Sequence, residues 1–463
     1  MTQYISNPGW TLKKVSNFEN SWPKKSQKRK RKKNKPGSAL VNRIIIYIRH
    51  LFYFTQLPQE KLLGPLGSKR SGKIVFLFGD EFNPVPSFDN MKFYYLLNEM
   101  KRRGMTVTWL RVNSSRREST KGDVRFDTIK LKAPKLLSSM ELFVRLIQYC
   151  LRNKITIVYF DEWLYFRNRP NLRFLTVLAL KLAGARPIVD RRDPYLDFQV
   201  AQGKISEHSM KAVFIRLQER LMIRLSTLTI LTSGAYQRLL VDEGHPPCKL
   251  IGVFRGVDTT KFSPTVDGKQ VRSALNVEDK FVIGWFGMMH KHRLIEEVLL
   301  PLAKKASNLW PDAHIIIGGK GPLKKSVVEF LKSNPNAPLS YVGLIPYDEL
   351  PKYIAACDVT LCPVQTNSRF SLHSNWLKIV ESLAVGTPVI ATRTKTSIMD
   401  MKKLRGVVWT GKTLDDYVHS IDSVRKDKLH WKSEALLQAD QMVEYSVSYN
   451  IPRLVDLICK NGT

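Results

Sequence analysis

Three polar side chains in the stretch "HSNWLKIVESLAVGTPVIAT", His373 to Thr392, have types and a spacing that suit ligand binding. The stretch predicts a helix, a Gly-Thr-Pro turn and a buried strand. Ser374, Lys378 and Glu381 follow an i, i+4, i+7 spacing, which places them on one face of that helix. A glutamate there can accept two hydrogen bonds from a vicinal diol such as a ribose. The alternative is a surface Lys378–Glu381 ion pair, worth roughly 0.2–0.5 kcal/mol.

Two cations follow the apolar run "VIGWFG". Lys291 and Arg293 stand directly before an expected helix. Amides at a helix N-terminus and an Arg/Lys pair together make a site for phosphate oxygens. The alternative is ordinary surface basicity, because the chain carries a net charge of +34. After "HIIIGG", the turn Gly319-Lys320-Gly321-Pro322 would let the backbone come close to a bound ligand, so Gly319 and Gly321 are candidate donor-binding residues, although this motif is weak alone and is not GxGxxG.

The elements that must position these residues alternate in type. Apolar runs of strand length alternate with helix-like stretches from "GKIVFLFG" onward, and again from "KFVIGWFG" onward. A stretch rich in Pro and Gly separates the two series and places a boundary at about Ser263 to Asp279. The pattern predicts an α/β fold with two tandem Rossmann-like, doubly wound domains. The binding site is then expected in the cleft that the carboxyl ends of both sheets face.

The chain therefore divides into four predicted segments. Residues 1–72 form a basic N-terminal extension, and residues 73–265 and 266–440 form the two Rossmann-like domains. Residues 441–463 form a C-terminal helix that is expected to pack back on the first domain.

Several motifs of the second half resemble the donor-binding domain of family 4 glycosyltransferases, which share the GT-B fold. They are "GVDTTKF", "GKGP", "YVGLIPYDELPKYIAACDVTLCP" and "KIVESLAVGTPVIAT", in the family's order and spacing. Together they cover roughly Ile251 to Thr392. The first half is similar in architecture only.

The resemblance implies a nucleotide-sugar donor and retention of configuration at the anomeric carbon. It implies that Glu381 binds the ribose hydroxyls, that Arg293 binds the diphosphate, and that Lys378 is a lysine seen in one branch of the family. The chain departs from the pattern twice. Met288 stands where the family usually has an arginine, for which Lys291 compensates, and His373 stands where a glutamate usually contacts the donor sugar.

The first domain is expected to bind the acceptor. Acidic groups follow its strands, among them Asp161 and Asp193. Either carboxylate could orient the acceptor hydroxyl or accept its proton, so both are candidate catalytic residues together with His373. Helix capping and salt bridges remain open as alternatives.

No metal or other cofactor is expected. The sequence contains no D-x-D, and its five cysteines form no CxxC. Arg293 and Lys291 would instead neutralise the leaving diphosphate.

The N-terminal extension is strongly basic. Residues 1–72 contain 16 basic and 2 acidic residues, and nine of the twelve residues from Lys24 to Lys35 are basic. Such a run suits an anionic surface. The apolar segment Arg43 to Phe54 is too short to span a membrane but could lie in its interface. A capping helix for the next domain and a nucleic-acid arm remain alternatives for this extension.

These features predict a retaining, metal-independent glycosyltransferase that works at the cytoplasmic face of a membrane on a lipid-linked or surface-glycan acceptor. One alternative is a sugar-nucleotide epimerase or hydrolase with the same fold. Another is an inactive GT-B shell that acts as a binding protein. Nucleic acid is not the expected partner, because the basic cluster lacks interleaved aromatic residues.

Overall fold

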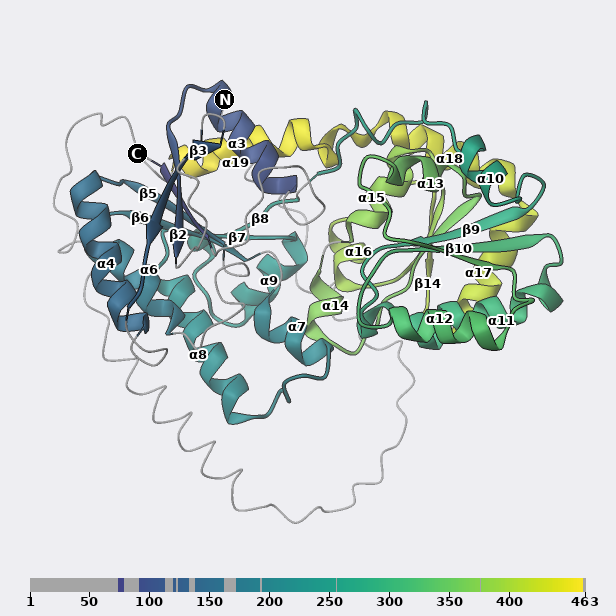
Figure 1. Ribbon diagram of the computed structural model, residues 1–463, viewed down its shortest axis with the longest axis horizontal. Coiled ribbons are helices and arrows are strands. Elements are labelled where there is room, and N and C mark those ends of the chain that lie inside the picture. The colour runs from purple at the N-terminus through teal and green to yellow at the C-terminus, as the bar shows by residue number, and fades with distance from the viewer. Residues whose placement is uncertain are drawn as a thin grey trace, which may run out of the picture. The chain divides into compact units, whose positions relative to one another are not determined.

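The described residues of the computed structural model form two sheets covered by helices. These residues are 74–78, 91–112, 120–121, 124–132, 138–161, 172–191, 194–254, 256–374 and 376–460. Both sheets belong to one compact unit, Ser71–Thr463 (Figure 1). The predicted α/β fold with two Rossmann-like domains is confirmed. The predicted basic extension, residues 1–72, lies outside the described residues.

The first sheet has eight strands within the described residues, in the order β3-β4-β2-β1-β5-β6-β7-β8. All neighbours are parallel except β3 and β4. The inner strands are buried apolar runs, as expected when helices cover both faces. The bounds are β1 Ile74–Phe78, β2 Val107–Val112, β3 Thr120–Lys121, β4 Val124–Ile129, β5 Ile157–Asp161, β6 Arg186–Arg191, β7 Leu228–Leu231 and β8 Leu250–Gly252.

Helices lie on both faces of the first sheet. On one face α3 and α19 pack against it, and on the other α4, α6 and α8 do so. Ser209 begins α8 by accepting a hydrogen bond from the Ala212 amide, and Ser233 begins α9 in the same way with Tyr236. The bounds are α3 Met91–Arg102, α4 Ser138–Asn153, α6 Arg173–Leu182, α7 Tyr195–Ala201, α8 Met210–Leu225 and α9 Gly234–Asp242.

The second sheet has six strands within the described residues, in the order β11-β10-β9-β12-β13-β14. All neighbouring strands are parallel, so the carboxyl ends of β9, β10 and β12 meet at one edge. The bounds are β9 Phe281–Phe286, β10 Ala313–Gly318, β11 Leu339–Gly343, β12 Val359–Cys362, β13 Val389–Thr392 and β14 Val407–Thr410.

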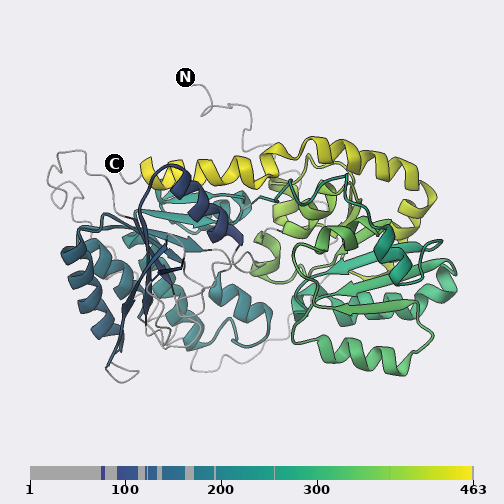
Figure 2. The same cartoon turned by 45° about the horizontal axis from the view of Figure 1, so that its top comes forward.

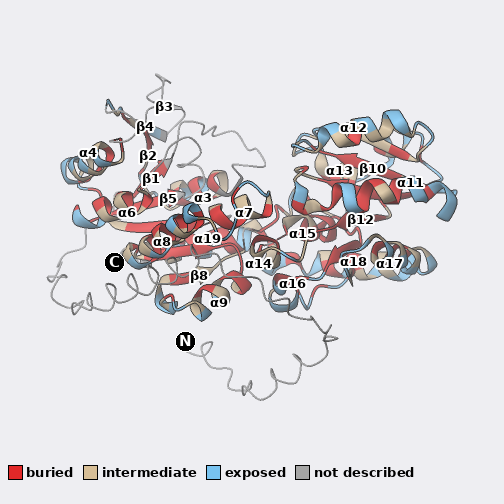
Figure 3. Cartoon of the chain, turned by 90° about the horizontal axis from the view of Figure 1, so that it is seen from below, coloured by how far each residue is buried: buried red, intermediate tan, exposed pale blue. Residues whose placement is uncertain are grey.

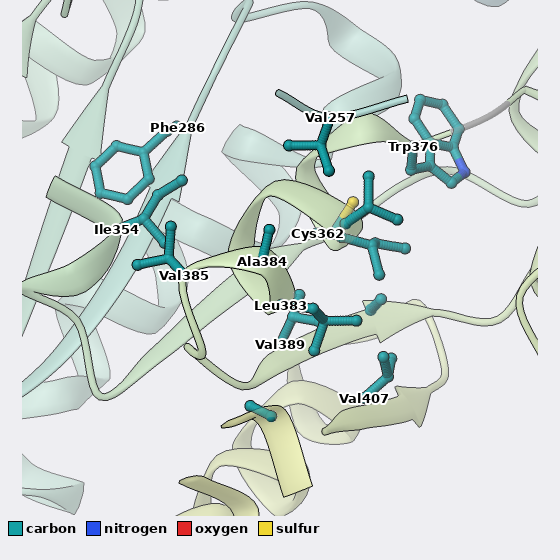
Figure 4. Packing of buried hydrophobic residues seen from close by; sticks show 14 of the residues in the cluster. Val257, Phe286, Ile354, Cys362, Trp376, Leu383, Ala384, Val385, Val389 and Val407 are labelled. Atoms are coloured by element: carbon teal, nitrogen blue, oxygen red, sulfur yellow. The ribbon is translucent and has the colours of Figure 1, made fainter. Parts of the chain in front are cut away.

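Helices also cover both faces of the second sheet. Figure 4 shows part of one core, in which Phe286, Cys362, Trp376 and Leu383 are labelled. The bounds are α10 Lys269–Ala274, a 3-10 turn Lys291–Arg293, a π-helical turn Ile295–Leu299, α11 Leu300–Leu309, α12 Lys324–Ser333, α13 Leu350–Ala355, α14 Arg369–His373, α15 Leu377–Ala384, α16 Lys395–Met399, α17 Leu414–Lys426, α18 Lys428–Asp440 and a 3-10 turn Met442–Tyr445.

The last helix, α19 (Val447–Lys460), packs against α3 of the first sheet (Figure 2). Its apolar side chains Ile451, Leu454, Val455 and Ile458 belong to the core between this sheet and α3. The predicted domain limits at 265/266 and 440/441 stay predictions, because the strands locate the two sheets but not the borders of the domains.

The structure corrects one local prediction. The stretch from His373 does not form one helix, because α14 ends at His373 and α15 begins at Leu377. Ser374 has extended backbone angles and caps the end of α14, so it does not share a helix face with Lys378 and Glu381. The predicted turn and strand are present: Gly386, with φ +73°, reverses the chain into β13.

Candidate functional site

Two ionisable groups on α15 each have a buried polar atom without a hydrogen-bond partner among the described residues. Lys378 Nζ and Glu381 Oε1 form no hydrogen bond with any part of the chain that the structure describes. Glu381 is 2% exposed. Lys378 as a whole is half-buried, but its amine is buried. A buried polar atom with no hydrogen-bond partner carries a desolvation penalty, so other interactions of the folded protein must offset this cost.

The surroundings shift the pKa values of both groups so that the neutral form of each is favoured. Burial raises the pKa of Glu381 to about 7, against the opposing effect of the Lys378 charge. Burial, together with the nearby Arg293 guanidinium, lowers the pKa of Lys378 to about 7. A ligand that brings an anion to Lys378 and hydroxyl groups to Glu381 would restore both charged forms. Shifted pKa values of this kind are common at functional sites.

The Lys378 amine lies over the carboxyl end of β9. Its Nζ is 4.1 Å from the centroid of the Trp285 ring, within the range of a cation–π contact. A Cβ atom on Gly287 would lie 2.0 Å from the same nitrogen. Gly287 also has a φ of +148°, which side chains rarely adopt. The lysine can therefore reach this place only because residue 287 is a glycine.

The predicted glycine turn serves a different contact from the one expected. Gly319 and Gly321 have φ values of +143° and +148°. A Cβ on Gly319 would lie 1.9 Å from the Gly287 carbonyl oxygen, and one on Gly321 would lie 2.7 Å from the Met289 amide. The glycines thus let the loops after β9 and β10 pack against each other. Their predicted contact with a donor stays a prediction.

The two predicted phosphate-binding cations, Arg293 and Lys291, lie in different surroundings. The Arg293 guanidinium lies 4.3 Å from the centroid of the Trp376 ring. Its positive charge acts to lower the pKa of Lys378 and of Cys362. Arg293 therefore belongs to the Lys378–Glu381 site. Lys291 is exposed and lines a pocket of about 240 Å³. The other residues that line this pocket include Asp197, Glu207, Gln365, Asn367, Ser368 and Arg369.

His373 and Ser374 end α14 and have partners within the chain. His373 Nδ1 lies 3.0 Å from the Arg369 carbonyl oxygen, and burial lowers the pKa of its imidazole. The Ser374 hydroxyl donates a 2.6 Å hydrogen bond to the Phe370 carbonyl. These bonds explain the conformation of both side chains without a ligand, and their predicted roles stay predictions.

The predicted acidic residues of the first half fall largely outside what the structure describes. Asp161 ends β5, but its side chain is not described, and Asp193 lies outside the described residues. The neighbouring Asp190 carboxylate accepts a 2.6 Å hydrogen bond from the Tyr159 hydroxyl. Arg191 pairs with Glu219 at 3.1 Å, and both are buried. Asp190 and Arg191 therefore form buried polar contacts with other side chains, which agrees with the structural alternative for this region.

Sequence reasoning missed Arg369. It lies on α14, and its Nη2 donates to Glu243 at 2.7 Å while its Nε donates to Asp197 at 3.1 Å. Asp197 lies on α7, between β6 and β7 of the first sheet, and Glu243 ends α9, between β7 and β8, whereas α14 follows β12 of the second sheet. Their separations of 172 and 126 residues explain why no local pattern indicates the pairing.

Sequence reasoning also passed over His292, which stands between the two predicted cations. It is 1% exposed, and its Nδ1 lies 2.6 Å from Gln202 Nε2. Burial lowers the pKa of His292, and the Arg293 charge lowers it further, so the imidazole stays neutral. The sequence shows only a histidine inside a basic run, and such a histidine is as common on a protein surface as in a buried site.

Comparisons with known proteins agree on the fold. Residues 280–427 match the family described as glycosyl transferases group 1. The structure of Anabaena Alr3699/HepE in complex with UDP matches with a TM-score of 0.62 and 16% identity, over 84% of this chain and 100% of that chain.

Two further solved structures have the same arrangement. Sucrose-phosphate synthase from Thermosynechococcus elongatus matches with a TM-score of 0.62 and 14% identity, over 84% and 98% of the two chains. A structure described as a putative UDP-N-acetylglucosamine 2-epimerase from Listeria monocytogenes matches with a TM-score of 0.53 and 11% identity, over 84% and 96%. A search of the curated proteins found no match.

Proposed function

We propose, because residues 280–427 match the family described as glycosyl transferases group 1, that this chain is a retaining glycosyltransferase that uses a nucleotide-sugar donor. The observation that carries this proposal is that two buried atoms, Lys378 Nζ and Glu381 Oε1, have no hydrogen-bond partner among the described residues. Glu381 accepts hydrogen bonds from the ribose hydroxyls, and Lys378 with Arg293 faces the diphosphate. The solved structure of HepE with UDP supports a donor of this class.

The reaction breaks the bond between the anomeric carbon and a diphosphate oxygen. Negative charge then develops on the diphosphate, and fixed cations stabilise it most where water is excluded. Lys378 and Arg293 are such cations, since both are held over tryptophan rings. We propose that they take the place of a metal ion, and that an acidic group of the first half, Asp161 or Asp193, orients the acceptor hydroxyl. His373 would face the donor sugar.

We further propose a lipid-linked or surface-glycan acceptor, and a peripheral position at the cytoplasmic face of a membrane. The basic residues 1–72 support this, although they lie outside the described part of the chain. Within the described residues, no helix combines the length and hydropathy that a membrane span requires. Deletion of residues 1–60 is expected to weaken binding to anionic liposomes in a flotation assay, and unchanged binding would contradict this part of the proposal.

An epimerase or hydrolase is the second candidate, since the fold is shared with the Listeria structure. A thermal-shift panel of UDP-, GDP- and ADP-sugars identifies the donor, because a ligand at about 100 times its Kd adds about 2.7 kcal/mol of apparent stability. Incubation with that donor, isotopically labelled in the sugar and in the presence of EDTA, then separates the reactions. We expect the label to move only when an acceptor is added. Free labelled sugar or its epimer without acceptor would contradict the proposal.

A further inference from the structure

The outer surface of α4, α6 and α8 has no partner within the described residues. These three helices lie side by side on one face of the first sheet (Figure 1). Their inner sides, such as Leu146, Leu180 and Met222, pack against the sheet. Their outer sides are therefore expected to be polar, as on most surface helices.

The outer sides are instead apolar at regular positions. On α4, Met140, Val144 and Leu151 are 50%, 49% and 60% exposed and stand at i, i+4 and i+11, which is one face of the helix. On α8, Met210 and Phe214 are 60% and 49% exposed, again four residues apart. Figure 3 marks the exposed parts of these helices in pale blue.

The regular positions of these side chains distinguish this surface from one on which apolar residues are scattered singly. Single apolar side chains on a surface are common and carry no meaning. Here, however, the last residue of α6, Leu182, is 63% exposed as well, so each of the three helices has an exposed apolar side chain. Exposed apolar side chains that recur on neighbouring helices are typical of a surface that binds something.

The charges on these helices indicate what binds. Arg and Lys outnumber Asp and Glu by eight to two on α4, α6 and α8. Both acids are already paired: Glu141 with Arg145 at 2.7 Å, and the buried Glu219 with Arg191 at 3.1 Å. The exposed cations on the same three helices are Arg152, Lys181, Lys211, Arg220 and Arg224.

We propose that the outer surface of α4, α6 and α8 is a docking face for a membrane that contains anionic lipids. The apolar side chains enter the boundary between headgroups and acyl chains, and the surrounding cations contact lipid phosphates. A second copy of the same face is disfavoured, because two such basic surfaces repel each other. The inference builds on the proposed membrane location, but it assigns the contact to folded helices and not to residues 1–72.

Flotation of the full-length protein tests the face with a matched control. The vesicles are phosphatidylcholine with and without about 30% phosphatidylglycerol. The test variant is Met140→Glu/Val144→Glu/Phe214→Glu. The control is Leu429→Glu/Leu437→Glu/Val443→Glu, which adds the same charge at positions that are 85%, 44% and 63% exposed near the other sheet. The test variant is expected to bind anionic vesicles at least about tenfold more weakly than the control. Equal binding by the two variants would overturn the proposal.

Hydrogen exchange of the unmodified full-length protein separates this face from the basic extension. Peptides that cover α4 and α8 are expected to exchange more slowly when anionic vesicles are present. A protein that floats without such protection would show that only the extension binds, and would overturn the proposal. So would protection that depends on protein concentration without vesicles, which would assign the face to a second copy. Unchanged nucleotide-sugar binding by the test variant shows that it folds and leaves the proposed function intact.

Discussion

At the scale of single residues, the site combines two groups that destabilise the ligand-free protein. The Lys378 amine and the Glu381 Oε1 atom are held out of water without hydrogen-bond partners among the described residues. Binding sites often contain such unfavourably buried groups, because the groups form favourable contacts once a ligand is bound. The ligand-free protein is then less stable than it could be. The stability of the protein without ligand should therefore report on the site.

Glu381→Gln is expected to stabilise the ligand-free protein in a pH-dependent way. Burial raises the pKa of Glu381 from its ordinary 4.5 to about 7. Between these values the unfolded chain releases this proton first, so the wild-type protein loses stability as the pH rises. The gain from Glu381→Gln should be small near pH 4.5 and should reach up to about 3 kcal/mol above pH 7.

Urea unfolding at low and high pH measures this gain. Glu329→Gln is the control, because Glu329 lies on α12 and its side chain is 61% exposed. Lys378→Met should show the opposite trend, since the pKa of Lys378 is lowered from 10.5 to about 7. Its stabilisation should be largest below pH 7 and should fade toward pH 10.5. A pH-independent gain for both variants would contradict the assignment.

The types of these residues could be predicted from the sequence, but their surroundings could not. Spacing on a helix placed Lys378 and Glu381 together. It also placed Ser374 with them, and this is wrong because α15 starts only at Leu377. The tryptophan rings under Lys378 and Arg293 come from β9 and from residue 376, and no local pattern reports contacts between loops and strands.

At the scale of elements, the loop after β9 depends on a glycine. Gly287→Ala is expected to destabilise the protein and to displace the Lys378 amine, because a Cβ would lie 2.0 Å from Nζ at a φ of +148°. We expect a loss of about 2–4 kcal/mol, which combines backbone strain with the displaced side chain. Thermal unfolding and nucleotide-sugar binding measure the two effects.

Gly184→Ala is the matched control for this change. Gly184 also has a positive φ, of +77°, but a Cβ there would meet nothing within 4 Å. It should therefore lose only about 1–2 kcal/mol from strain and keep donor binding. Equal effects of both substitutions on binding would show that Gly287 does not act through Lys378.

The strands of both sheets were easier to predict than the short helices between them. Buried parallel strands are continuous apolar runs, so "KFVIGWFG" and "DVTLCPV" indicated β9 and β12. The five-residue helices α14 and α16 show no helical periodicity over so few residues and could not be recognised.

At the scale of the whole described chain, contacts between distant segments connect the two sheets. Arg369 on α14 pairs with Glu243 and with the buried Asp197. The Ser233 hydroxyl at the start of α9 donates to the His373 carbonyl at 2.6 Å, and Asp400 Oδ2 accepts from the Gly234 amide at 2.8 Å. The Arg369 and Ser233 bonds hold α14, which precedes α15, against segments of the first half, and the Asp400 bond does the same for the end of α16.

Arg369→Ala is expected to weaken this connection. Among the described residues, it leaves the buried Asp197 with Arg216 as a partner, 2.8 Å away. We expect a loss of about 2–4 kcal/mol in unfolding free energy, because removing one partner leaves a buried charge under-compensated. Arg405→Ala, at a surface pair with Glu434 where Arg405 is 49% exposed, should cost less than about 1 kcal/mol. Losses of equal size in urea unfolding would contradict a structural role for Arg369.

The central claim is that Lys378 and Glu381 hold a nucleotide-sugar, and titration calorimetry with the donor found by the thermal-shift panel tests it most directly. Each lost contact involves a charged group, so Glu381→Gln and Lys378→Met should each weaken binding by about 10- to 100-fold. Glu329→Gln should bind as the wild type does. Wild-type affinity in both site variants would contradict the account.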